Sequence, residues 1–143
     1  MHPPLNPWQS YRKAATQTAS PGQLVLMLYD GAIRFLERSL QGFELEDPAE
    51  CNSAINNNII RAQEIIRELD HSLNMEIGGE FSATMHRLYR YFDLELTRSN
   101  IEKESVGIRT IIRLITGLRD AWFEMVSKGT SNISGAELVT AAA

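Results

Sequence analysis

The chain has 143 residues, of which 43% are hydrophobic, so it is long enough to form one domain with a substantial apolar core. Its 14 Lys and Arg residues are outnumbered by 18 Asp and Glu residues, which gives a net charge of −4. This balance argues against a protein that binds nucleic acid regardless of its sequence, because such proteins need clustered positive charge to neutralise phosphates.

The sequence favours an intracellular protein. A single cysteine, Cys51, cannot form a disulfide within the chain, which fits a reducing compartment. The first residues, Met1 to Trp8, lack the charged start and apolar run of a signal peptide. The longest apolar run, Leu24 to Tyr29, is too short to span a bilayer. We therefore expect a cytoplasmic protein with no membrane insertion and no nucleic-acid partner.

A first helix is predicted from about Pro21 to Leu40. Ser20, Pro21 and Gln23 form a start signal, in which a serine caps the helix, a proline occupies its first position and a glutamine reaches back. The polar residues of this segment fall on one narrow stripe. The remaining apolar surface is wider than a contact between two layers needs.

A second helix is predicted to begin after Asp47, because Asp47-Pro48-Ala49-Glu50 again combines a cap, a proline and an acid three residues on. Its apolar residues alternate at spacings of four and three, which is typical of a helix that packs along a bundle seam. They are Ile55, Ile59, Ala62, Ile66, Leu69 and Leu73.

Two further helices follow. The segment Asn74 to Gly79 is expected to interrupt the chain, with Asn74 as a C-cap, and a third helix then continues to about Asn100. A fourth helix is predicted from about Glu104 to Ser127, because its apolar residues again repeat at three and four. The seam positions are Phe81, Met85, Leu88, Phe92 and Leu96 in the third helix and Ile108, Ile111, Ile115, Leu118, Trp122 and Met125 in the fourth.

These stretches predict an all-α fold, an antiparallel up-down four-helix bundle with an extra N-terminal segment packed on it. We expect residues 20–127 to form the bundle, residues 1–19 to form an N-terminal cap or gate, and residues 128–143 to form a flexible tail. The N-terminal segment carries Leu5, Trp8 and Tyr11 at three-residue spacing. That is too much apolar side chain for a purely solvated tail.

The sequence offers little catalytic or metal-binding chemistry. It contains no glycine-rich phosphate loop and no pattern of a nucleophile with a matched acid and base. Glu68 and His71 have the spacing found in di-iron bundles, but those sites need a second such pair and two further inward carboxylates. We expect no enzymatic activity, no metal and no cofactor, and a metal-binding bundle is the less favoured alternative.

Charged and apolar side chains outside the seams suggest interaction surfaces. Four arginines are candidates for a small basic strip, although the acids around them in sequence favour a salt-bridged outer surface. Six apolar residues lie at the sides of the apolar faces of the first and third helices. They are either buried in the centre of a small bundle, or they form a groove for a partner segment or for self-association. The arginines are Arg87, Arg90, Arg109 and Arg113, and the flanking residues are Leu26, Tyr29, Ile33, Tyr89, Tyr91 and Leu94.

Several stretches of the sequence resemble motifs of one bacterial family, and they occur in the same order and at the same spacing as in that family. The most specific is the run Thr18 to Ala32, TASPGQLVLMLYDGA. Over roughly residues 6–126 the chain resembles FliS, the family of flagellar export chaperones. The other matching stretches are Asn6 to Tyr11, Gly78 to Glu80, Leu88 to Tyr91, Ser99 with Asn100, and Leu118 to Trp122.

The resemblance implies a non-enzymatic cytoplasmic chaperone that binds the C-terminal segment of flagellin, prevents its premature polymerisation and assists its delivery to the type III export gate, where FlhA is the usual docking partner. Family members are helical bundles with an N-terminal segment over part of the binding surface, and we expect a monomer or a homodimer. The resemblance implies that the flagellin-contact residues are Leu26, Tyr29, Ile33, Tyr89, Tyr91 and Leu94. It also implies that Leu5, Trp8 and Tyr11 act as an N-terminal gate or in docking to the export gate.

Overall fold

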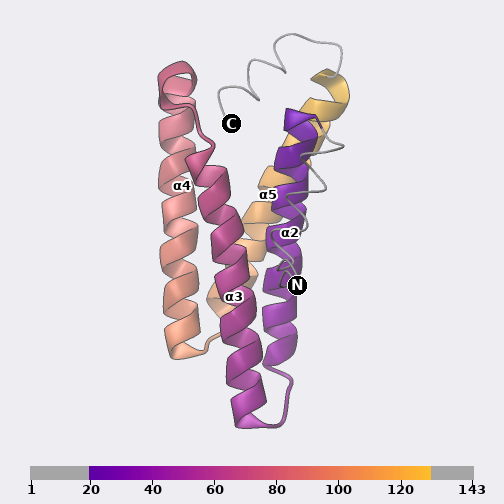
Figure 1. The fold of residues 1–143 in the computed structure, drawn as a ribbon, viewed down its shortest axis with the longest axis vertical. Coiled ribbons are helices and arrows are strands. Elements are labelled where there is room, and N and C mark those ends of the chain that lie inside the picture. The colour runs from indigo at the N-terminus through magenta and orange to yellow at the C-terminus, as the bar shows by residue number, and fades with distance from the viewer. Residues whose placement is uncertain (1–19, 130–143) are drawn as a thin grey trace, which may run out of the picture.

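The computed structural model describes residues 20–129, which form four helices: α2 (Pro21–Gly42), α3 (Pro48–His71), α4 (Met75–Glu102) and α5 (Val106–Gly129). Successive helices run antiparallel, and each contacts the next, while α5 returns to contact α2 (Figure 1). No strand occurs in this part of the chain. The predicted all-α up-down four-helix bundle is therefore confirmed.

Two predictions fall outside the described residues. The gate residues Leu5, Trp8 and Tyr11 belong to residues 1–19, and almost all of the predicted tail belongs to residues 130–143. The division of the chain into three segments stays a prediction.

The starts of α2 and α3 follow the cap signals in the sequence. The Gln23 backbone N–H donates to the Ser20 hydroxyl at 3.3 Å, and the Ser20 N–H donates to the Gln23 side chain at 3.1 Å, which completes a capping box. Asp47 accepts from the Glu50 N–H at 2.9 Å in the same way. Each side chain satisfies a backbone donor that the first helical turn leaves open.

The connection between α3 and α4 differs from the prediction. Asn74 caps the start of α4 rather than the end of α3, because its side-chain oxygen accepts from the Glu76 and Ile77 N–H groups at 3.1 and 2.9 Å. The interruption expected at the glycines is present as a kink inside α4, where Gly79 has φ 51° and ψ −123°. A residue with a Cβ adopts a positive φ only at a cost, so glycine suits this kink.

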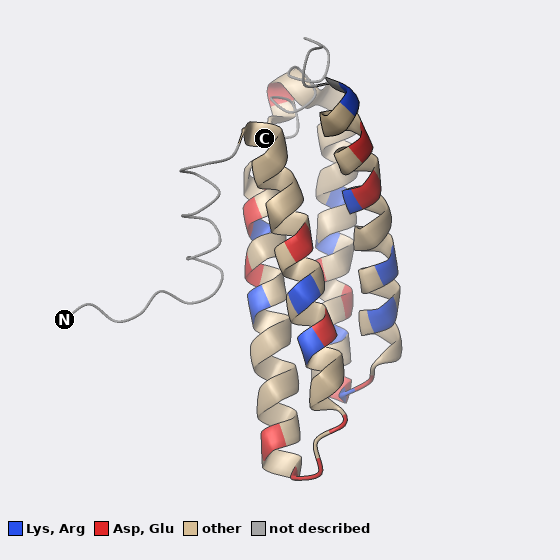
Figure 2. Ribbon diagram, turned by 90° about the vertical axis from the view of Figure 1, so that its right-hand side faces the viewer, with Lys and Arg blue, Asp and Glu red and all other residues tan. Residues whose placement is uncertain are grey.

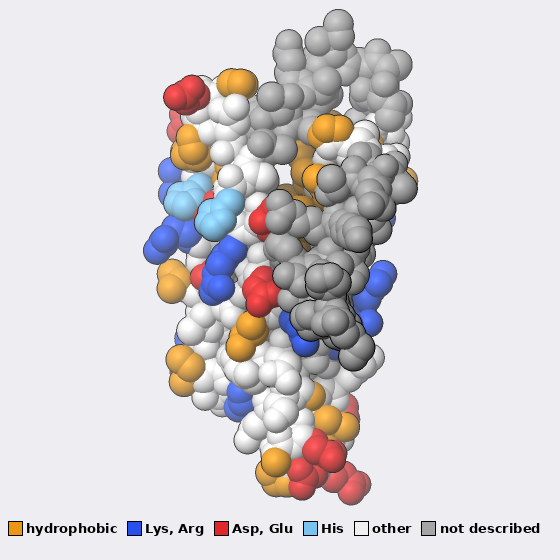
Figure 3. Space-filling model, in the orientation of Figure 1, with side chains coloured by type: hydrophobic (Ala, Val, Ile, Leu, Met, Phe, Trp, Pro, Cys, Tyr) orange, Lys and Arg blue, Asp and Glu red, His pale blue; other side chains and the backbone are white. Residues whose placement is uncertain are grey.

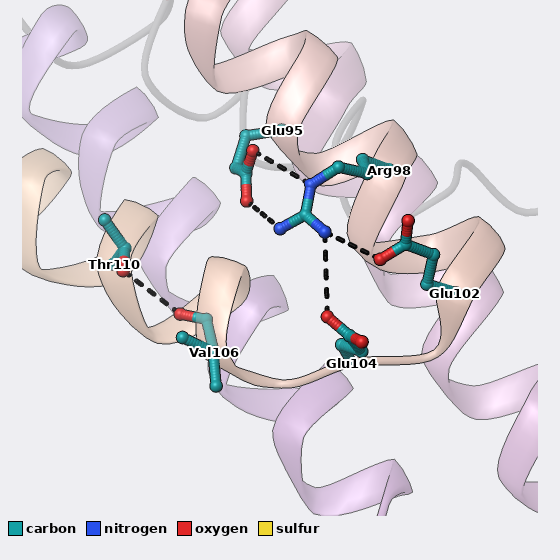
Figure 4. Close-up of polar contacts among 6 residues, drawn as sticks. All are labelled: Glu95, Arg98, Glu102, Glu104, Val106 and Thr110. Atoms are coloured by element: carbon teal, nitrogen blue, oxygen red, sulfur yellow. Dashed lines mark hydrogen bonds and ion pairs between the residues drawn. The ribbon is translucent and has the colours of Figure 1, made fainter.

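The turn from α4 to α5 is tied by a cluster of charged side chains around Arg98 (Figure 4). Its guanidinium pairs with Glu95, with Glu102 at 2.6 Å and with Glu104 at 3.6 Å. The hydrogen bonds from Arg98 lower the pKa of Glu95. Lys103 ends α4 in the left-handed conformation at φ 53°, which reverses the chain within residues 103–105.

The core confirms most of the predicted seam positions, but Phe81, which lies just after the kink in α4 at the open end of the bundle, is 42% exposed. The seam residues Ile55, Ile59, Phe92, Leu96 and Ile108 are fully buried. Polar pairs run beside this core between α3 and α4, with the antiparallel register that the topology requires. The pairs are Asn56 with Asn100 at 2.9 Å, Gln63 with Thr97 at 2.9 Å, Arg67 with Asp93 at 3.2 Å, and Asp70 with His86 at 2.7 Å.

Charged residues of both signs are interspersed along the helices, and acidic residues gather at the turn between α2 and α3 (Figure 2). Glu44, Glu46 and Asp47 belong to that turn. Within residues 20–129, no helix has an apolar stretch suited to crossing a membrane.

Candidate partner-binding cavity

An apolar cavity of about 210 Å³ lies at one end of the bundle, and all four helices contribute to its lining. This is the end at which α2 and α4 begin and α3 and α5 finish (Figure 1). No charged side chain belongs to the lining of this cavity in the described structure. The lining residues are Val25 and Tyr29 from α2, Leu69 from α3, Phe81, Met85 and Tyr89 from α4, and Leu118, Ala121, Trp122 and Met125 from α5.

The cavity has a buried interior and an accessible rim. Tyr29, Leu69 and Tyr89 are buried, whereas Phe81 is 42% exposed and Ala121 is exposed as well. An apolar opening of this kind suits an apolar side chain or a short amphipathic segment, because burial of such a group removes both surfaces from water.

Two tyrosines supply hydroxyl groups to the lining. The hydroxyl oxygens of Tyr29 and Tyr89 lie 2.6 Å apart, so each phenol satisfies the other. Burial raises the pKa of Tyr29 to about 12, although the hydrogen bond with Tyr89 opposes the shift. Burial is also the main reason why the pKa of Tyr89 lies well above its usual value. Both side chains are therefore neutral at physiological pH, and the cavity carries no charge from them.

Trp122 contributes a polar atom whose hydrogen-bonding capacity is unused. The side chain is only 7% exposed, and its indole Nε1 has no hydrogen-bond partner among the described residues. A buried donor without an acceptor costs about 1–3 kcal/mol. An occupant that placed an oxygen atom near this nitrogen would recover part of that cost.

An ion pair links α2 and α5 beside the cavity. Arg119 Nε donates to Asp30 Oδ1 at 2.8 Å, and its guanidinium carbon lies 5.0 Å from the centre of the Phe123 ring. Asp30 follows Tyr29 in the chain, and Arg119 follows Leu118. The pair therefore helps to fix the two helices where they line the cavity.

The predicted flagellin-contact residues do not form one surface. Tyr29 and Tyr89 line the cavity, but Leu26 is buried and Ile33 is half-buried against the core. Tyr91 and Leu94 are 45% and 63% exposed on α4 and do not line the cavity. Of the six residues, the structure thus brings Tyr29 and Tyr89 together in this cavity. The other four lie in the core or on a different face.

Most of the remaining cavity residues are predicted seam positions, whereas Val25 and Ala121 are not among the predicted seams. Phe81 and Met85 belong to the predicted seam of the third helix, and Leu118, Trp122 and Met125 to that of the fourth. Periodicity indicates which face of a helix turns inward, but it does not indicate where four inward faces leave a space.

The described residues contain no group of three or more His, Cys, Asp or Glu side chains that could hold a metal ion. Glu68 and His71, the two residues with the spacing found in di-iron bundles, therefore belong to no such group. Nearby, His86 Nδ1 lies 2.7 Å from Asp70 Oδ1, which is an ordinary inter-helix contact between α4 and α3.

Comparisons with known proteins place the chain in a family. The family model described as flagellar protein FliS matches residues 4–129. The chain is 36% identical over 121 residues to the flagellar secretion chaperone FliS of Bacillus subtilis, an alignment that covers 85% of this chain and 86% of that protein. It is 29% identical over 119 residues to the protein of the same name in Salmonella typhimurium, covering 82% and 85% of the two chains.

A third relative extends the match. The flagellar secretion chaperone FliS of Vibrio cholerae is 27% identical over 134 residues, covering 91% of this chain and 95% of that protein. The match to the family model and the relatives aligned over most of their length agree with the resemblance found in the sequence, and we conclude that the chain belongs to the FliS family.

Proposed function

We propose that this protein is a flagellar secretion chaperone that binds the C-terminal segment of flagellin and prevents its premature polymerisation. The observation that carries the proposal is membership of the FliS family, whose similar members are named flagellar secretion chaperones. Flagellin is the client that the sequence resemblance implies. The role is one of binding, and no catalytic step is part of it.

The cavity at the end of the bundle is the proposed anchor for the client. It is apolar, all four helices line it, and its rim at Phe81 is accessible. A client segment that is disordered when free pays an ordering cost on binding, which keeps even a large interface reversible. Reversible binding is what a chaperone that hands on its client requires.

The proposed client contacts come from both α2 and α4, the two helices that carry the predicted flagellin-contact residues. Tyr29 and Tyr89 would contact the anchored side chain inside the cavity. Leu26 and Ile33 would support the α2 wall, while Tyr91 would contact a client that continues along α4. Leu94 lines a separate hollow between α3 and α4, so we assign it no client contact. Leu26 is buried, so its contribution would be to hold the wall in place.

The N-terminal segment is a proposed gate for the same cavity. Residues 1–19 join α2 at Ser20, close to the cavity residue Val25. The segment carries Leu5, Trp8 and Tyr11, whose apolar side chains suit an apolar opening. We propose that these residues cover the cavity until flagellin displaces them. They then become available for docking to the export-gate protein FlhA in the cytoplasm.

A flagellin polymerisation assay tests this function. The protein should lower the rate of filament growth progressively as its concentration rises towards that of flagellin. A variant without residues 1–17 should suppress growth at lower concentrations, because no gate competes for the cavity. Unchanged filament growth with both proteins would contradict the chaperone function, whereas equal potency of the two would contradict only the gate.

A further inference from the structure

The seam between α3 and α4 carries two hollows on its outer side, separate from the proposed client cavity except that Tyr89 lines both the cavity and the first hollow. The first hollow, of about 220 Å³, lies between Arg67 and His71 of α3 and Arg90 and Leu94 of α4. The second, of about 550 Å³, lies nearer the far end of the same two helices, beside Ile101.

Each hollow has an exposed aliphatic side chain at its edge. Leu94 is 63% exposed and Ile101 is 78% exposed. They are seven residues apart in α4, so they lie on one face at a separation of about 10.5 Å along the helix axis. This separation equals the heptad repeat of an amphipathic helix, which would present apolar residues to both positions at once.

The charges along this face are unevenly balanced. In the first hollow, Asp93 is paired with Arg67 and Asp70 lies 2.7 Å from His86, whereas Arg90 has no ion-pair partner among the described residues. One turn earlier, Arg87 donates a hydrogen bond to Thr84 and likewise has no ion pair there. The expected salt-bridging of these two arginines is therefore not seen in the structure.

The other end of α4 has the opposite balance, since three carboxylates surround the single guanidinium of Arg98 (Figure 4). The space-filling view of the face over α4 and α3 shows basic and histidine side chains gathered in its upper half, with separate hydrophobic side chains along its edge (Figure 3). The α3–α4 face thus combines two exposed aliphatic side chains with positive charge at one end.

We propose that this α3–α4 face is a docking site for an amphipathic helix of a second protein, with acidic residues at the end that lies over Arg87 and Arg90. The acidic end of the helix would pair with these two arginines, and two apolar residues a heptad apart would cover Leu94 and Ile101. A small inorganic anion would use the arginines but would leave both aliphatic side chains exposed. The site lies outside the client cavity, so client and second partner would bind together.

A synthetic helical peptide, with leucines seven residues apart and glutamates at one end, tests the proposal by fluorescence anisotropy. The full-length protein should bind it saturably. Leu94→Asp should weaken binding by about tenfold, because a buried apolar contact is lost. Arg90→Glu should weaken it by about fivefold, the upper range for an exposed ion pair. Arg113→Glu is the matched control, because Arg113 also has no ion pair in the described structure but lines neither hollow.

Three results would overturn the proposal. Absence of saturable peptide binding to the full-length protein would show that the α3–α4 face is not a docking site. Equal weakening of peptide binding by Arg90→Glu and Arg113→Glu would show that the peptide binds through general electrostatic attraction and not at this site. Displacement of the peptide by the C-terminal segment of flagellin would assign the face to the client instead. The last result would leave the proposed chaperone function intact, so the two proposals fail separately.

Discussion

The hydroxyl oxygens of Tyr29 and Tyr89 lie 2.6 Å apart and join α2 to α4, two helices whose backbones do not come into contact with each other. The bond spans the inside of the bundle at the cavity. It gives each buried phenol a partner, and it couples the two helices that begin at the open end.

Removal of one partner of this hydrogen bond should destabilise the protein. In Tyr89→Phe the Tyr29 hydroxyl stays buried without its partner, so we expect the free energy of unfolding to fall by about 1–3 kcal/mol. The double variant Tyr29→Phe, Tyr89→Phe should lose less than the sum of the two single losses, since neither hydroxyl is then left behind. Urea unfolding of the four proteins measures this coupling. Strictly additive losses would contradict the buried pair.

The same pair predicts a loss of stability at alkaline pH. Tyrosines of the unfolded chain ionise near pH 10, at about their ordinary pKa, but burial raises the pKa of Tyr29 to about 12 in the folded protein. Above the unfolded pKa, the unfolded chain has released protons that the folded chain retains, so the free energy of unfolding falls as the pH rises towards the folded pKa.

A pH series of urea unfolding curves measures this effect. The double variant Tyr29→Phe, Tyr89→Phe should lose less stability between about pH 10 and 12 than the unmodified protein does. A parallel decline in both proteins would show that other groups cause the alkaline loss.

Two glycines of α5 should respond to alanine in opposite ways. A Cβ at Gly107 would overlap Ser99 Oγ and Glu95 Oε1 of α4, so Gly107→Ala should lower the free energy of unfolding by about 1–3 kcal/mol. A Cβ at Gly117 meets no atom within 4 Å. Gly117→Ala should therefore raise it by about 0.5–1 kcal/mol through helix propensity. Thermal unfolding distinguishes the two, and a neutral Gly107→Ala would show that the helices do not approach so closely.

The rim of the cavity offers a test of client binding that does not rely on core residues. Phe81 is 42% exposed and lines the cavity, whereas Phe123 is 49% exposed and does not. Phe81→Asp should weaken binding of the flagellin segment by about tenfold or more, because it places a charge beside the bound apolar group. Phe123→Asp should leave affinity within about twofold. Calorimetric titration of both variants, with melting temperatures as a control for folding, measures the difference.

The helices could be predicted from the sequence because their signals are local. The seam spacing of Ile55 and Ile59 and the caps Ser20 and Asp47 each depend on residues within a turn or two. Asn74 was assigned to the wrong helix because an asparagine suits both a C-cap and an N-cap, and only the hydrogen bonds to Glu76 and Ile77 decide between them.

The cavity could be predicted only in part. Tyr29 and Tyr89 were selected as flanking apolar residues, yet their hydroxyl contact depends on the packing of helices that are 60 positions apart in sequence. Trp122 was expected as an ordinary seam residue, and nothing local indicates that its indole nitrogen lacks a partner. Such features arise from the fit of four helices in three dimensions, which periodicity does not describe.

Isothermal titration of the full-length protein with the C-terminal segment of flagellin tests the central claim most directly. The account predicts saturable one-to-one binding, with a negative change in heat capacity because apolar surface is buried. A variant lacking residues 1–17 should bind more tightly. No heat of binding at several temperatures, from either the full-length protein or the variant without residues 1–17, would contradict flagellin as the client of this FliS-family protein.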